Sequence, residues 1–74
     1  MTLHDFAASF KPCPGSYEVY IVHPKTGEAV KVNFSLPEGT PSKVRVARRE
    51  IDFEYGKHTV EIRFRHDGSV SVRN

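Results

Sequence analysis

The stretch that decides the fold is YEVYIVHPKTGEAVKVNF, residues 17–34. Two runs of alternating apolar and polar residues flank Pro24–Gly27, where proline presets the first turn position and glycine can adopt a left-handed conformation. A four-residue loop of this kind sets a register that places Ile21 opposite Val30. Because the turn chemistry and the hydrophobic alternation agree, the stretch predicts an antiparallel hairpin with one apolar face.

The same test predicts two further hairpins in the second half of the chain. The first has a two-residue Gly56-Lys57 turn with glycine in the position that a type II′ turn prefers. A two-residue Asp-Gly turn in the second would place Phe64 opposite Ser71, an apolar residue against a polar one. A three-residue turn at 66–68 instead places Phe64 opposite Val70. We choose the three-residue turn because it keeps the apolar face continuous.

One break in the alternation lies before these hairpins. Val44 and Val46 are in phase with each other but out of phase with Ile51 and Phe53 along the chain. We therefore expect residues 47–50 to absorb one extra residue in a β-bulge or a short bend. Because a bulge curls a sheet, a partly open barrel is an alternative to an open sheet.

The N-terminal segment predicts a short helix near residues 3–10. Thr2 is a suitable N-cap, and Pro12 and Pro14 cannot continue a helix. Four apolar residues share one helical face: Leu3, Phe6, Ala7 and Phe10. So short a helix needs that face packed against the rest of the protein.

The predicted fold class is mainly β, or α+β by count. It is one small domain over residues 1–74, in which residues 1–15 form a helix and a proline-rich linker and residues 16–74 form an antiparallel β-meander of five or six strands. The strands are expected near 17–23, 28–35, 43–47, 50–55, 58–65 and 69–73. The predicted core contains Phe6, Phe10, Val19, Ile21, Val30, Val32, Phe34, Ile51, Phe53, Val60, Ile62, Phe64, Val70 and Val72.

Composition bounds the function. A chain of 74 residues has a small core, which leaves little room for a deep cofactor pocket. The single Cys13 and four scattered histidines match neither the spacing of a zinc site nor a Cys–His nucleophile. We therefore expect no catalytic residues, no metal, no cofactor, no small-molecule substrate and no membrane contact. Because one cysteine cannot form an internal disulfide, a cytoplasmic location is expected.

Two surfaces are candidates for function. The first consists of Tyr20, Val22 and Ala29, which point away from the predicted core face and form an apolar patch. It predicts a contact with another protein or with a second copy, unless the N-terminal helix covers it or the sheet curls over it. A protein-interaction role of this kind is our first functional hypothesis. Unpaired edge strands offer a related route to a partner.

The second candidate is a basic patch at an arginine-rich edge of the sheet, which predicts nucleic-acid binding through guanidinium–phosphate contacts. The expected register places Arg48 opposite Arg65 on the solvent face. Cross-strand ion pairs with neighbouring acidic residues are an alternative explanation of most of these charges. The patch comprises Lys43, Arg45, Arg48, Arg49, Arg63 and Arg65. Because the aromatic residues fall mainly on the core face, this role ranks second.

Overall fold

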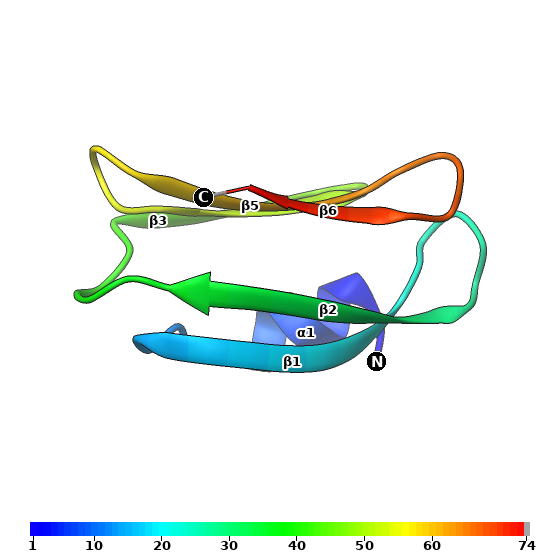
Figure 1. Ribbon diagram of the computed structural model, residues 1–74, viewed down its shortest axis with the longest axis horizontal. Helices are drawn as coiled ribbons and strands as arrows, with labels where there is room; N and C mark the ends of the chain where they lie inside the picture. The colour runs from blue at the N-terminus through cyan, green and yellow to red at the C-terminus, as the bar shows by residue number, and fades with distance from the viewer. Residues whose placement is uncertain (74) are drawn as a thin grey trace.

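The computed structural model describes residues 1–73 and contains one short helix and six antiparallel strands (Figure 1). The predicted bounds agree with the observed ones to within two residues. The elements are α1 (Leu3–Ser9), β1 (Gly15–Val22), β2 (Ala29–Leu36), β3 (Lys43–Ala47), β4 (Glu50–Glu54), β5 (Thr59–Phe64) and β6 (Val70–Arg73).

The strands form two sheets that face each other across the core. One contains β1 and β2, and the other has the order β3-β4-β5-β6, so each sheet is a meander. Figure 1 shows the four-stranded sheet on one side of the core, with β1, β2 and α1 on the other. The mainly β fold class is therefore confirmed, and the sheets do not close into a barrel.

The predicted hairpin registers are also confirmed. Ile21 lies opposite Val30 in the first hairpin, and the amide of His23 donates to the carbonyl of Glu28 over 2.8 Å. The predicted three-residue turn at 66–68 is confirmed as well, since Phe64 lies opposite Val70. Turn chemistry thus specified which side chains reach the core in both sheets.

The expectation that residues 47–50 absorb one extra residue, in a β-bulge or a short bend, is wrong. The chain instead reverses in a two-residue turn at Arg48-Arg49, and Ala47 lies opposite Glu50. Because the strand reverses, Val46 lies opposite Ile51 on the same face of the sheet. The phase break along the chain therefore marks a hairpin and needs no extra residue.

Helix α1 packs against the core that lies between the two sheets. Thr2 caps it by accepting a hydrogen bond from the Asp5 amide. The Phe6 ring contacts Phe34 of β2 edge-on, and the Phe10 ring contacts Phe53 of β4 in the same manner. Phe6 of α1 and its C-cap residue Phe10 therefore join both sheets.

Burial is concentrated over the two central strands of the larger sheet. Ile51 and Phe53 of β4 are at most 1% exposed, and the three inward residues of β5 are equally buried. The inward residues of β3 are different, because Val44 is 40% exposed and Val46 is 41% exposed. A two-stranded sheet and one short helix do not extend far enough to cover β3.

Three buried residues are missing from the predicted core. Leu3 and Leu36 are 5% exposed, and both are apolar residues at the ends of their elements. The third is His23, whose side chain is fully buried and packs edge-on against Phe64. Sequence reasoning considered this histidine only as a possible ligand or base.

His23 connects the turns of two separate hairpins. Its Nδ1 accepts hydrogen bonds from the amides of Lys25 at 3.0 Å and Thr26 at 3.4 Å. Its Nε2 lies 3.3 Å from the carbonyl oxygen of Ser69, so the tautomer with a proton on Nε2 donates there. The buried imidazole therefore satisfies backbone groups of the β1–β2 turn and links them to the β5–β6 connection.

We expect the substitution His23→Ala to lower the free energy of unfolding by about 2–4 kcal/mol, because it leaves a cavity and removes these hydrogen bonds. The matched control is His58→Ala, which truncates an exposed histidine and should change stability by less than about 0.5 kcal/mol. Urea denaturation followed by circular dichroism measures both. Equal effects of the two substitutions would contradict a structural role for His23.

Candidate interaction surfaces

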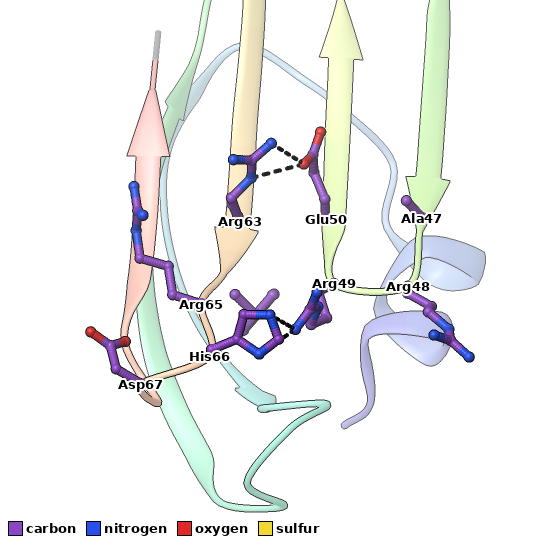
Figure 2. A pocket seen from close by; sticks show the side chains of 9 residues that line it. Ala47, Arg48, Arg49, Glu50, Arg63, Arg65, His66 and Asp67 are labelled. Carbon is purple, nitrogen blue, oxygen red and sulfur yellow. Dashed lines mark hydrogen bonds and ion pairs between the residues drawn. The ribbon is translucent and has the colours of Figure 1, made fainter.

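An open pocket of about 550 Å³ lies at one end of the four-stranded sheet (Figure 2). The β3–β4 turn and the β5–β6 turn meet there, and they bring together four arginines. The lining residues are Ala47, Arg48, Arg49, Glu50, Arg63, Phe64, Arg65, His66 and Asp67. We call this the arginine pocket.

One arginine of the pocket is already neutralised. Arg63 lies opposite Glu50 across β4 and β5, and its Nε and Nη2 atoms are both 3.0 Å from Glu50 Oε1. Partial burial opposes ionisation of Glu50, but the hydrogen bonds with Arg63, Asp52 and Glu61 and the charge of Arg63 together outweigh it and lower the pKa of that carboxyl. The same hydrogen bond raises the pKa of Arg63. This pair is the cross-strand ion pair expected from the sequence.

Two further groups of the pocket are held by local contacts. Arg49 Nη1 is 2.8 Å from both ring nitrogens of His66, so the guanidinium is in close contact with the imidazole. Asp67 accepts hydrogen bonds from the side chain of Ser69 at 2.6 Å and from its amide at 2.9 Å, and these lower the pKa of Asp67. The acidic Asp67 offsets part of the positive charge of the pocket.

Arg48 and Arg65 do not meet across the sheet. Arg48 lies in the turn beyond the end of the β4–β5 ladder, whose last backbone hydrogen bond joins the Phe64 amide to the Arg49 carbonyl. Figure 2 shows the Arg48 and Arg65 side chains on opposite sides of the pocket, pointing away from each other. Neither forms an ion pair within residues 1–73.

The remaining two members of the predicted basic patch lie on β3, outside the pocket lining. Lys43 and Arg45 are on the outer face of the sheet, which alternates with the face of Val44 and Val46. Arg45 is 3.6 Å from Glu54, and its side chain is 63% exposed. The predicted patch is therefore two separate basic regions.

The predicted apolar patch at Tyr20, Val22 and Ala29 lies on the outer face of the small sheet. Tyr20 is 57% exposed and Ala29 is exposed, but Val22 is half-buried. The amide of Val22 donates to the carbonyl of Met1 at 2.7 Å, and Thr2 forms a parallel bridge with Val22, so the N-terminal residues lie along the edge of β1 beside Val22. Helix α1 packs on the other face, so it does not cover this patch.

A patch this small offers limited apolar area. Lys31 lies opposite Tyr20, and its ammonium is 3.3 Å from Glu18, so charged groups border the tyrosine directly. Binding surfaces normally place charged residues at their rim. The tyrosine patch therefore has almost no apolar centre.

The β3 edge is a third surface, defined here as the unpaired backbone side of β3 together with Val44 and Val46. β3 is the last strand of its sheet, and all five of its residues are exposed. In an antiparallel ladder, alternate residues direct their backbone N–H and C=O groups away from the partner strand. The β3 edge therefore presents free hydrogen-bonding groups beside two exposed valines.

Three carboxylates lie together on the outer face of β4 and β5. Oxygen atoms of Glu50, Asp52 and Glu61 are all within 4.8 Å of one another. Burial raises the pKa of Asp52 to about 6, and the nearby carboxylates of Glu50 and Glu61 add to this. Carboxylate oxygens are ligands for hard cations, but Glu50 is already bonded to Arg63. Sequence reasoning overlooked this cluster, although the predicted register places Asp52 opposite Glu61.

The raised pKa of Asp52 predicts a pH-dependent effect of Asp52→Asn. Between the ordinary pKa of 3.8 and the folded-state value of about 6, the folded protein keeps a proton that the unfolded chain releases, so ionising Asp52 destabilises the fold as the pH rises through this window. We expect Asp52→Asn to stabilise the protein at pH 7.5 by on the order of 1 kcal/mol, allowing for solvent screening, and to have little effect at pH 4.

Urea denaturation of both proteins across this pH range measures the difference. A stability difference that stays constant with pH would show that the ionisation of Asp52 is not its cause. Glu50 must remain unchanged in both proteins, because its own lowered pKa acts in the opposite direction with pH.

Among residues 1–73, no helix has the length and apolar character needed to cross a membrane. Comparisons of the chain with protein-family models, with curated protein sequences and with solved structures find no match. The protein presents three candidate interaction surfaces: the arginine pocket, the tyrosine patch and the β3 edge.

Proposed function

We propose that this chain is a small protein-interaction module that binds its partner at the β3 edge. The observation that carries the proposal is the exposure of Val44 and Val46, at 40% and 41%, beside an unpaired strand edge. Natural proteins commonly shield such edges, because free backbone groups recruit other chains. An edge strand with exposed apolar residues is typical of surfaces that bind extended protein segments.

The tyrosine patch supports the proposal less well. It contains one strongly exposed large side chain, Tyr20, and an ion pair lies next to it. The β3 edge instead combines apolar side chains with backbone hydrogen-bonding groups. Those groups can supply affinity that a small apolar area cannot.

Because the exposed Cys13 is the only thiol in the chain, a reducing compartment such as the cytoplasm suits the protein.

Photo-crosslinking in the cells that express the protein tests this function. A photoreactive amino acid placed at Val44 should give a protein adduct, because that side chain would lie inside the interface. The same amino acid at Glu38, an exposed residue of the β2–β3 loop, is the matched control and should give far less. Mass spectrometry of the purified adducts identifies what is bound.

A third position, Tyr20, separates the two apolar surfaces. Adducts from Tyr20 but not from Val44 would move the interface to the outer face of the small sheet and contradict our assignment. Protein adducts from none of these positions above the Glu38 background would contradict an interaction role altogether. Circular dichroism of each labelled protein confirms that the substitution has left the fold intact.

The arginine pocket supports a second candidate function, nucleic-acid binding. Arg48, Arg49 and Arg65 line one open pocket, and guanidinium groups match the geometry of phosphate oxygens. Two observations count against it. Asp67 lies beside Arg65, and the aromatic residue of the lining, Phe64, is buried and unavailable for base stacking.

This second role predicts binding that depends steeply on salt. Three phosphate contacts to a single strand correspond to a loss of affinity of about twentyfold between about 50 mM and about 200 mM salt. Fluorescence anisotropy with a mixed oligonucleotide pool measures this, and Arg48→Glu should reduce the affinity while Lys25→Glu should have a smaller effect. No affinity for DNA or RNA at low salt would eliminate the candidate.

A further inference from the structure

We propose that the β3 edge takes up one extended peptide segment in which acidic and apolar residues alternate. The segment adds to the larger sheet as a fifth strand beside β3. This inference rests on the proposed function and names the class of its partner. It follows from three features of β3: its unpaired backbone, the two exposed valines on its inner face and the basic residues on its outer face.

The inner face of β3 requires apolar residues in the partner. Val44 and Val46 point to the same side as Ile51 and Phe53 but lack the cover that those residues have. Side chains alternate between the two faces of a strand, so every second residue of an added strand would lie next to these valines. Apolar side chains at those positions would extend the core by one strand.

The outer face of β3 requires acidic residues at the positions between them. Lys43 and Arg45 project from that face, and Arg48 follows in the turn, where Figure 2 shows its side chain pointing away from the rest of the arginine pocket. Arg45 is 3.6 Å from Glu54 on the β4 side of the strand, whereas Lys43 and Arg48 form no ion pair within residues 1–73. Because cross-strand pairs of opposite charge stabilise a sheet, carboxylates opposite these residues would be favoured.

The same charges disfavour a second copy of this chain as the occupant. An antiparallel pair of β3 strands centred on Arg45 would place that arginine opposite its own copy. A pair centred on Val44 would place Lys43 opposite Arg45. Both registers juxtapose like charges, which destabilise a sheet. In these two registers the basic residues oppose self-pairing, whereas an acidic strand would meet no such repulsion.

The test uses a blocked peptide of about seven residues that alternates valine and glutamate, with an alternating valine–lysine peptide as its control. Amide NMR of the labelled protein follows each titration. We expect the glutamate peptide to shift the resonances of residues 43–47 and the lysine peptide to leave them unchanged. Arg45→Glu should weaken binding of the glutamate peptide about tenfold and allow the lysine peptide to bind.

Two controls distinguish strand addition from general charge attraction. Lys25→Glu makes the same charge change in the β1–β2 turn and should leave the affinity nearly unchanged. Two further glutamate peptides carry N-methyl groups on one or the other alternate set of amides. Only the peptide whose methylated amides face β3 should lose binding, because methylation removes the hydrogen-bond donors.

Several results would overturn the inference. The first is equal binding of the glutamate and lysine peptides, and the second is an equal loss of affinity with both methylated peptides. The third is a set of resonance shifts centred outside residues 43–47. The fourth is a shift of the resonances of residues 43–47 on protein dilution or on adding oligonucleotide. Failure to bind the glutamate peptide would also overturn it. If Val44 nevertheless gives protein adducts in cells, the interaction function stands and only strand addition is wrong. If Val44 gives none, both proposals fail.

Discussion

The structure depends on the burial of the inner face of the β1–β2 hairpin. A two-stranded sheet is marginal in water, so β1 and β2 can persist only if Ile21, Val32 and Phe34 are covered by other elements. The four-stranded sheet provides that cover, and Phe6 of α1 and its C-cap residue Phe10 fill the space beside it. The two layers differ in width, since one has four strands and the other has two strands and a short helix. The narrower layer covers β4 and β5 completely but leaves the valines of β3 exposed. The feature that stabilises the core thus also creates the candidate binding edge.

Most of the fold could be predicted from the sequence because strand alternation and turn chemistry constrain each other. The Pro24–Gly27 loop allows a register in which Ile21 meets Val30, and the structure has this register. Residues 47–50 were predicted wrongly. Along the chain Val46 and Ile51 are out of phase, but in two antiparallel strands joined by a two-residue turn the residues that share a face are those opposite each other in the ladder. Arg48-Arg49 has neither the glycine nor the asparagine that normally marks such a turn, so local composition gave no signal.

The candidate surfaces were harder to predict, since they depend on how the sheets pack. The exposed Tyr20 follows from alternation alone, and the structure places it on an open face. The exposure of Val44 does not follow, because a valine in an alternating strand is expected to be buried, and only the width of the opposing layer decides otherwise. The arrangement of the basic residues also depends on packing and turns that sequence proximity does not show. Sequence proximity suggested one patch, but the two-residue turn separates Arg48 from Arg65 and leaves Lys43 and Arg45 on a different part of the sheet.

Polar groups give this small core much of its specificity. A core made only of apolar residues would allow the two sheets to slide over each other, because hydrophobic burial is non-directional. His23 opposes such sliding, because its two ring nitrogens face backbone groups of different hairpins. Both contacts are kept only when the two hairpins stay in this relative position. On the outer face, the Glu50–Arg63 pair adds support to the β4–β5 register, whereas Asp52 opposite Glu61 destabilises it. The four-stranded sheet therefore tolerates an unfavourable acidic contact in its centre, whereas the basic residues of β3 lie opposite acidic residues of β4, with Arg45 3.6 Å from Glu54. The proposed acidic strand would face the same basic residues from the unpaired side of β3.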